Sequence, residues 1–150
     1  MDRREMMQSG VTLALATAGT SAMAQTGSAE HNHHHHHGGG ASYSSLAGAA
    51  AGCTSAGQAC LAHCVALLGQ GDKDMAACAA KVSQMLATCE AMMKLAASDS
   101  KYVPKMAALT LAACKECGAE CSMHAAKHQA CKDCADACAV CGAECKKVSA

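Results

Sequence analysis

The chain has 150 residues, with 12 Lys and Arg balanced by 12 Asp and Glu, 13 Cys, 10 Met, and neither Phe nor Trp. A neutral chain without a basic patch lacks the electrostatic footprint of a nucleic-acid-binding protein, so we expect no nucleic-acid partner. The apolar residues are mainly Ala, Leu, Met and Cys. This mix favours helix over strand and leaves sulfur-containing side chains to fill much of the core.

Residues 1–24 are predicted to be an export signal. Arg3 and Arg4 precede a weakly apolar stretch that ends in the sequence AMA at 22–24, an A-x-A cleavage pattern. The stretch is too short and too rich in Thr, Gly and Ala for a membrane span, which needs about 20 apolar residues. The paired arginines resemble a twin-arginine signal, which predicts export to a bacterial periplasm with no membrane insertion after cleavage. A general secretory signal and a cytosolic N-terminus are the alternatives.

Residues 25–42 are predicted to be a disordered linker rich in His, Gly and Ser. The sequence HNHHHHH from His31 to His37 has two interpretations. It is either a natural metal-capturing tail, since clustered imidazoles bind Cu(II), Ni(II) and Zn(II), or an artificial tag. In both cases it is not part of the fold.

The remaining segment, 43–150, is predicted to form four helices of similar length. The first runs from about 44 to 68 and ends at the sequence GQGD, whose Asp72 is the predicted N-cap of the second helix. The second helix runs to about residue 97, where the sequence SDS interrupts the helical pattern.

The third helix is expected to begin near residue 101, because Pro104 is tolerated only in a first turn. Its boundary with the fourth helix is placed around 123–126. Each helix then has about 20–25 residues, or about 30–37 Å at 1.5 Å per residue. Short connections make neighbouring helices antiparallel, so the sequence predicts an all-α, up-down-up-down four-helix bundle.

The cysteines recur at helical spacing. Within each predicted helix their separations are 3, 4, 7 or 11 residues, which places all the thiols of one helix on one face. The four stripes are predicted to face one another and to line the core. Apolar residues on or beside these stripes are Leu46, Val82, Met85, Met92 and Met106. The cysteines are Cys53, Cys60, Cys64, Cys78, Cys89, Cys114, Cys117, Cys121, Cys131, Cys134, Cys138, Cys141 and Cys145.

Inward-facing thiols in this number have two roles that involve no metal. As small hydrophobic side chains they are a poor choice, because Leu at the same positions would bury more apolar surface. As disulfides they are odd in number, and neighbours on one helix have Cβ atoms about 5–6 Å apart where a disulfide needs about 3.8 Å. Disulfides between helices remain possible.

Metal binding is the third role, and the ligand pattern favours Cu(I). Structural zinc and iron–sulfur clusters take sets of four ligands, whereas the CxxC pairs here lie within helices. Cu(I) is soft, selects thiolate and thioether, and accepts two or three ligands. One Cu⁺ per thiolate also neutralises the buried charge, whereas each Zn(Cys)₄ unit leaves two negative charges. The sequence therefore predicts multiple Cu(I) ions.

The stretch CKECGAECSMHAAKHQACKDCADACAVCGAEC, residues 114–145, resembles the signature of the copper storage protein family, and the resemblance extends over about 43–148. It implies a Cys-rich four-helix bundle filled with Cu(I) bound mainly between pairs of cysteines. It also implies a homotetramer that stores copper and has no catalytic activity. An exported branch of that family carries a twin-arginine signal, in keeping with Arg3 and Arg4. The His31–His37 run is not part of the family pattern.

The predicted topology suggests where copper enters. The turns between the first and second helices and between the third and fourth lie at one end of such a bundle. Thioether and imidazole groups there can pass Cu(I) inward to Cys64, Cys78 and Cys121. The alternative is that these residues are ordinary turn and core residues. The residues near this end are His63, Met75, Met123, His124 and His128; those of an apolar plug at the other end are Tyr43, Leu46, Met92, Met93, Leu95 and Met106.

The sequence thus predicts an exported copper store that holds on the order of a dozen Cu(I) ions per chain and is not an enzyme. Its expected partners are copper ions, further copies of the chain, and a copper chaperone or recipient cuproenzyme. One alternative is a thiol redox protein whose CxxC pairs exchange disulfides. Another is a general thiolate buffer for zinc or cadmium.

Overall fold

The computed structural model describes residues 43–149, and the segment is helical with short turns. It confirms the predicted all-α architecture. The predicted export signal at 1–24 and the linker at 25–42 lie outside the described residues. The helices are α1 (Ser44–Gly69), α2 (Met75–Ala97), α3 (Val103–His124) and α4 (Gln129–Val148).

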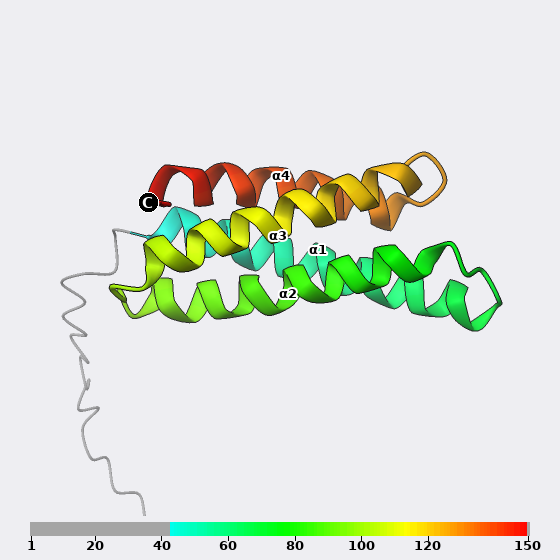
Figure 1. Ribbon diagram of the computed structural model, residues 1–150, viewed down its shortest axis with the longest axis horizontal. Coiled ribbons are helices and arrows are strands. Elements are labelled where there is room, and N and C mark those ends of the chain that lie inside the picture. Colours follow the sequence, from blue (N-terminus) through cyan, green and yellow to red (C-terminus); the bar gives the residue numbers. More distant parts are fainter. Residues whose placement is uncertain (1–42, 150) are drawn as a thin grey trace, which may run out of the picture. The chain divides into compact units, whose positions relative to one another are not determined.

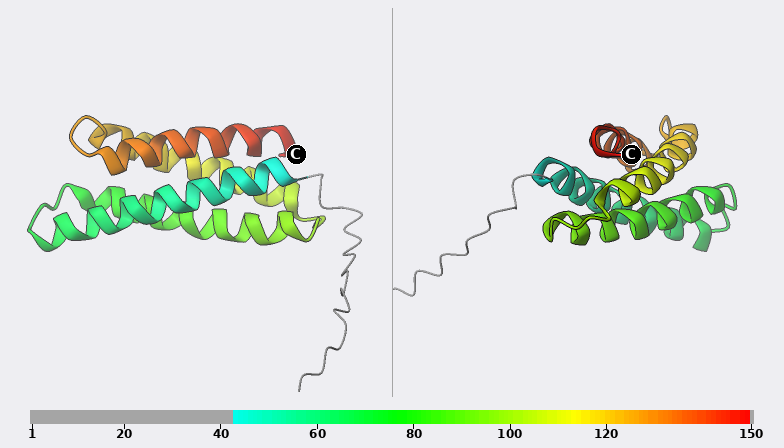
Figure 2. Two further views of the ribbon diagram at one scale, coloured as in Figure 1. Left: turned by 180° about the vertical axis from the view of Figure 1, so that it is seen from behind. Right: turned by 60° about the vertical axis from the view of Figure 1, so that its left-hand side comes forward.

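The four helices run alternately up and down (Figure 1). The α1–α2 and α3–α4 turns lie at one end of the bundle, and the α2–α3 turn lies at the other, as predicted. Helix α1 packs against α2 and α4, and α3 packs against the same two helices. The view from behind shows α1 between its two neighbours (Figure 2, left). Each helix therefore turns one face toward a shared interior.

The turn after α1 depends on a residue with positive φ. Gly71 has a φ of 94°, which an L side chain rarely adopts. The backbone N–H groups of Gly71 and Asp72 donate to the carbonyls of Leu68 and Leu67, each at 3.0 Å, which is a Schellman motif. The prediction of Asp72 as the N-cap of α2 is wrong, because α2 begins at Met75 and Asp74 is the residue before it. The Oδ1 of Asp72 accepts the N–H of Asp74 within the turn.

The turn after α2 uses the same motif without glycine. Asp99 has a φ of 51°, a conformation that Asp tolerates better than most residues. The N–H groups of Ser100 and Asp99 donate to the carbonyls of Leu95 and Ala96 at 3.0 and 3.2 Å. Pro104 then lies in the first turn of α3, as predicted.

The third turn is simpler. Helix α3 ends at His124, within the predicted boundary of 123–126, and residues 125–128 lead to α4. The backbone N–H groups of Lys127 and His128 both donate to the carbonyl of His124.

The interior is lined by sulfur. Every cysteine in residues 43–149 is buried, with at most 2% of its surface exposed, so the predicted inward stripes are confirmed. Leu46, Val82, Met85 and Met92 are buried among them, and Met106 is half-buried. The end of the core near the α2–α3 turn has the predicted apolar plug. Of its predicted members, Leu46 and Met92 are buried, and Tyr43, Met93, Leu95 and Met106 are half-buried and packed against the core. Val103, which was not predicted, is also buried at the start of α3.

Helix α1 is long and apolar enough to cross a membrane, judged by length and composition. Buried helices of soluble proteins meet the same criterion, and the cysteine face of α1 packs inside the bundle.

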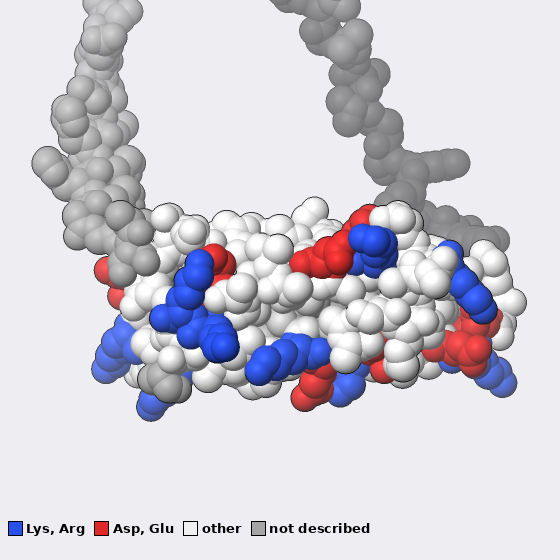
Figure 3. All heavy atoms as spheres, turned by 90° about the horizontal axis from the view of Figure 1, so that it is seen from above, with Lys and Arg blue, Asp and Glu red and all other residues white. Residues whose placement is uncertain are grey.

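The surface carries charges of both signs. On the face in Figure 3, basic and acidic side chains are interspersed among uncharged ones. Lys81 pairs with Glu116 at 2.7 Å and Lys132 with Asp136 at 2.6 Å. Such exposed pairs contribute little to stability, so the bundle depends on its interior.

Replacing Met92 with Ala should destabilise the metal-free bundle by about 2–5 kcal/mol, because it leaves a cavity in the plug. The control is Met123→Ala on the exposed surface of α3, which should change stability by less than about 0.5 kcal/mol. Urea unfolding of the reduced protein, followed by circular dichroism, measures both changes. Equal losses of stability from the two substitutions would contradict the packing of Met92 in the apolar plug.

Candidate metal centre

The thiols contact one another along the bundle interior. Sγ of Cys78 lies 3.6 Å from Sγ of Cys121, and Sγ of Cys117 lies 3.8 Å from Sγ of Cys134. In residues 43–149 all 13 cysteines are free thiols. The stripes that helical spacing places on separate helices therefore meet as a network of sulfur atoms.

Two sets of four thiols stand out within this network. Within each set the sulfur atoms all lie within 4.8 Å of one another. The first set takes one cysteine from each helix. The sets are Cys53, Cys89, Cys114 and Cys141, and Cys60, Cys64, Cys78 and Cys131. Two sets of three share Cys134: Cys60, Cys121 and Cys134, and Cys117, Cys134 and Cys138.

These four-thiol sets correct the expectation from the sequence that the chain offers no set of four ligands for zinc. The CxxC pairs lie within helices, so single helices offer only runs of thiols rather than zinc knuckles. Packing of the four stripes at the same level nevertheless brings four thiols together. The count of available ligands therefore does not exclude a tetrahedral metal.

The sulfur separations suit metal–thiolate bonding. A metal–sulfur bond of about 2.3 Å, as for zinc, puts two sulfurs on one ion about 3.8 Å apart at a tetrahedral angle and about 4.6 Å apart when collinear. The closest thiol pairs in the network are 3.6–4.0 Å apart. An ion can thus enter between two thiols with small side-chain movements.

The interior offers nothing else to neutralise a thiolate. In residues 43–149 the buried polar side chains are those of Thr54 and Thr110, and neither carries a charge. The Thr54 hydroxyl donates to the carbonyl of Ala50 at 2.9 Å. Burial raises the pKa of the Cys78 thiol to about 12 and also raises the pKa of Cys131. In the metal-free protein these thiols therefore keep their protons at neutral pH.

Hydrogen bonds between thiols shift the pKa values of three cysteines of α4 in opposite directions. The bond with Cys117 is the main cause that lowers the pKa of Cys134, and the bond with Cys114 lowers the pKa of Cys141 in the same way. The pKa of Cys138 is raised, chiefly through its bond with Cys114. Thiols in this network therefore titrate together rather than as independent groups.

Two predicted histidines meet near the α1–α2 and α3–α4 turns. Nε2 of His63 lies 2.9 Å from Nδ1 of His128, and their ring centroids are 4.9 Å apart. His124 is near the end of α3; its Nε2 lies 3.7 Å from Oε1 of Glu120 and has no hydrogen-bond partner among the described residues. An orphaned buried nitrogen of this kind suits a metal ligand.

The two methionines predicted at this end differ. Met75 opens α2 and is buried, with 1% of its surface exposed, so its thioether belongs to the interior. Met123 is 69% exposed on α3 and does not line the interior.

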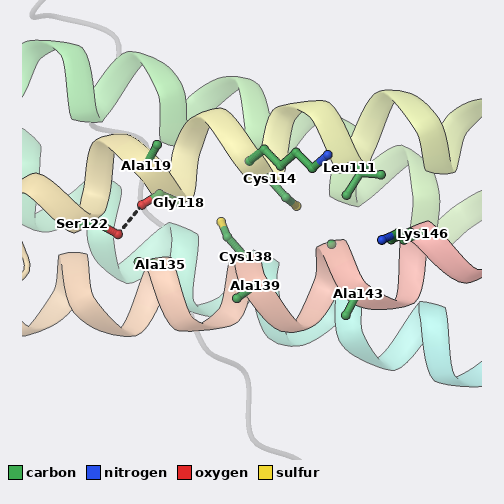
Figure 4. Close-up of a pocket in the computed structure, with 12 residues that line it drawn as sticks. Leu111, Cys114, Gly118, Ala119, Ser122, Ala135, Cys138, Ala139, Ala143 and Lys146 are labelled. Atoms are coloured by element: carbon green, nitrogen blue, oxygen red, sulfur yellow. Dashed lines mark hydrogen bonds between the residues drawn. The ribbon is translucent and has the colours of Figure 1, made fainter.

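A groove runs along the outside of α3 and α4 (Figure 4). Its volume is about 460 Å³, and small residues such as Gly118 and Ala139 line it. Cys114 and Cys138 form part of its lining, and they are the two cysteines with 2% of their surface exposed, compared with 0% for every other cysteine. The groove therefore reaches the edge of the thiol network but leaves the network itself covered.

Comparison with known proteins agrees with this geometry. The model of a family described as copper storage protein matches residues 40–150. The chain belongs to the copper storage protein family. Membership of a storage family, together with clustered buried thiols, supports binding of copper or another metal by thiolates.

The chain is also similar to an uncharacterized cysteine-rich protein of Bacillus subtilis strain 168, YhjQ. The two are 34% identical over 62 residues, which is 41% of this chain and 56% of that protein. The chain thus spans little more than half the length of this curated relative.

The metal-free bundle should lose stability as pH rises above about 9. An unfolded thiol has a pKa of 9.0, and folding raises that of Cys78 to about 12. The stability that Cys78 contributes as a protonated thiol is therefore fully present below pH 9 and is lost as pH rises through about 12. Thermal unfolding of the reduced protein at about pH 8 and pH 11 measures this loss, which should be smaller in Cys78→Ala. Identical pH dependence in both proteins would contradict the role of burial.

Proposed function

We propose that this protein stores Cu(I), holding on the order of a dozen ions per chain between cysteine thiolates inside the bundle. The observation that carries the proposal is the set of 13 buried free thiols, arranged in touching groups. The protein binds and releases copper and catalyses no reaction. Family membership supports this function.

Charge favours Cu(I) over a divalent metal. Each Cu⁺ that replaces a thiol proton leaves the interior neutral, so the whole network can fill without any buried counter-ion. Each Zn(Cys)₄ unit leaves two negative charges, and the buried side chains of residues 43–149 include no cation to balance them. Filling every site is therefore least costly with a monovalent ion.

A zinc or cadmium buffer is the second candidate. The four-thiol set of Cys53, Cys89, Cys114 and Cys141 has the ligand number that tetrahedral Zn²⁺ requires. Such a buffer would hold far fewer ions than there are thiols, because each ion uses four ligands. The number of ions bound therefore separates the two candidates.

Disulfide exchange has weaker support. A reactive dithiol needs an accessible thiolate, and redox-active CxxC cysteines are partly exposed. Here the CxxC pairs are Cys114 with Cys117, Cys131 with Cys134, and Cys138 with Cys141, and all six residues are buried.

Copper is proposed to enter between the α1–α2 and α3–α4 turns. The His63–His128 pair and the orphaned Nε2 of His124 supply nitrogen ligands there, and buried Met75 supplies a thioether. From these groups Cu(I) can pass to Cys64, Cys78 and Cys121 by exchange between soft ligands.

The proposal also includes the cellular compartment and the oligomeric state of the protein. Arg3 and Arg4 support twin-arginine export of a folded protein to a bacterial periplasm. Family resemblance supports a homotetramer. In that compartment a copper chaperone or a recipient cuproenzyme is the expected partner.

Titration of the reduced protein with Cu(I), in competition with a strong Cu(I) chelator, should give on the order of a dozen tightly bound ions per chain. The matched measurement with Zn²⁺ should give a few ions at most, because each uses four thiolates. One to three Cu(I) per chain would contradict storage. A zinc count equal to the copper count would contradict the charge argument.

A double variant with His63→Ala and Met75→Leu should load copper several-fold more slowly than the unsubstituted protein. The number of ions bound at the end should not change, because the core thiols remain. Stopped-flow loading from a Cu(I)–chelator complex measures the rate. Met93→Leu at the opposite end is the control and should load at the original rate. Equal loading rates in all three proteins would show that copper enters elsewhere.

A further inference from the structure

The cysteine stripe of α2 is interrupted by a thioether. Helix α2 contains only Cys78 and Cys89, three turns apart, and Met85 occupies an inward position between them with 0% of its surface exposed. In the other helices that line the network, thiols fill most of the comparable positions. Val82 is also fully buried between the two cysteines, but of these two residues Met85 alone places a sulfur atom there.

The sulfur atom of Met85 accepts hydrogen bonds from two thiols. Sγ of Cys53 donates to Sδ of Met85 at 3.3 Å, and Sγ of Cys89 donates to the same atom at 3.5 Å. Cys53 and Cys89 belong to the same four-thiol set, together with Cys114 and Cys141. The thioether is thus directed into a group of four thiols that could share a metal ion, and not into the apolar plug.

A glycine on α1 makes room for this side chain. A Cβ atom at Gly57 would lie 2.6 Å from Cε of Met85 and 2.9 Å from Cδ2 of Leu86. The space beside Gly57 is therefore used by the methyl end of Met85. Met92, one of the plug residues, is equally buried but has no sulfur contact of this kind within the described residues.

Cu(I) loading changes what the Met85 sulfur can do. Copper displaces the protons of Cys53 and Cys89 to solvent, and the thioether then loses its two S–H donors. Its lone pairs become free at a point where a Cu(I) ion binds both thiolates. Cu(I) accepts thioether ligands and a third donor, and a neutral thioether adds no charge to the interior.

We propose that Met85 is a Cu(I) ligand inside the thiol core, completing a site with Cys53 and Cys89. The inference rests on the proposed storage of Cu(I). It adds an internal thioether ligand to the thiolates of this four-thiol set. The absence of a side chain at Gly57 leaves room for the methyl end of Met85.

Selenomethionine-labelled protein tests the proposal. X-ray absorption at the selenium edge of the copper-loaded protein should show a selenium–copper shell. The shell contributed by residue 85 is lost in Met85→Leu, which preserves side-chain volume. Met92→Leu is the matched control and keeps the full shell. Equal selenium–copper amplitudes in the two variants would overturn the proposal.

Gly57→Ala provides a second test that leaves every sulfur atom in the chain. The new methyl group must displace the ends of Met85 and Leu86, which are flexible. The selenium–copper shell should weaken in this variant, whereas Gly48→Ala, which meets open space on α1, should leave it unchanged. Full amplitude in Gly57→Ala would contradict the positioning role of Gly57.

Counting the copper bound in the same samples distinguishes failure of the Met85 ligand from failure of copper storage. On the order of a dozen ions per chain, with no amplitude difference between Met85→Leu and Met92→Leu, would remove Met85 as a ligand and leave storage intact. A count of one to three ions in the unsubstituted protein would overturn both.

Discussion

A thiolate in the interior of this bundle must be neutralised, and the rest of the structure follows from that constraint. Burial raises the pKa of Cys78 to about 12, so this thiol keeps its proton in the metal-free core at neutral pH. The described interior offers no buried cation in exchange. A monovalent soft metal can replace the proton at every thiol and keep the interior neutral. The same constraint explains why cysteines fill a core that Leu would normally occupy.

The fold was predictable because helix geometry converts sequence spacing directly into position. Separations of 3 and 4 residues between Cys131 and Cys145 require one stripe on one helix, and short turns require antiparallel neighbours. The inward thiols and the apolar plug at Leu46 and Met92 followed from that geometry. The start of α2 did not, because residues 72–74, which local propensity assigns to the next helix, belong to the turn that follows Gly71.

The composition of the centre was less predictable, because it depends on the register between helices. Spacing along one chain segment does not show that Cys53 and Cys141, 88 positions apart, share one four-thiol set. The pairing of His63 with His128 depends on the same register. The contact between Gly57 and Met85 depends in addition on side-chain packing, since only the absence of a Cβ admits the methionine. The signal for it in the sequence is a glycine within a cysteine stripe.

A crystal structure of the Cu(I)-loaded protein would show whether the interior itself is the copper store. Anomalous scattering at the copper edge locates the ions independently of any assumed site. We expect copper peaks between cysteine sulfurs along the bundle, from the level of Cys64 to that of Cys145, because storage in the interior uses every thiol. Peaks confined to the ends or outer surface, or disulfides in place of metal within the core, would contradict it.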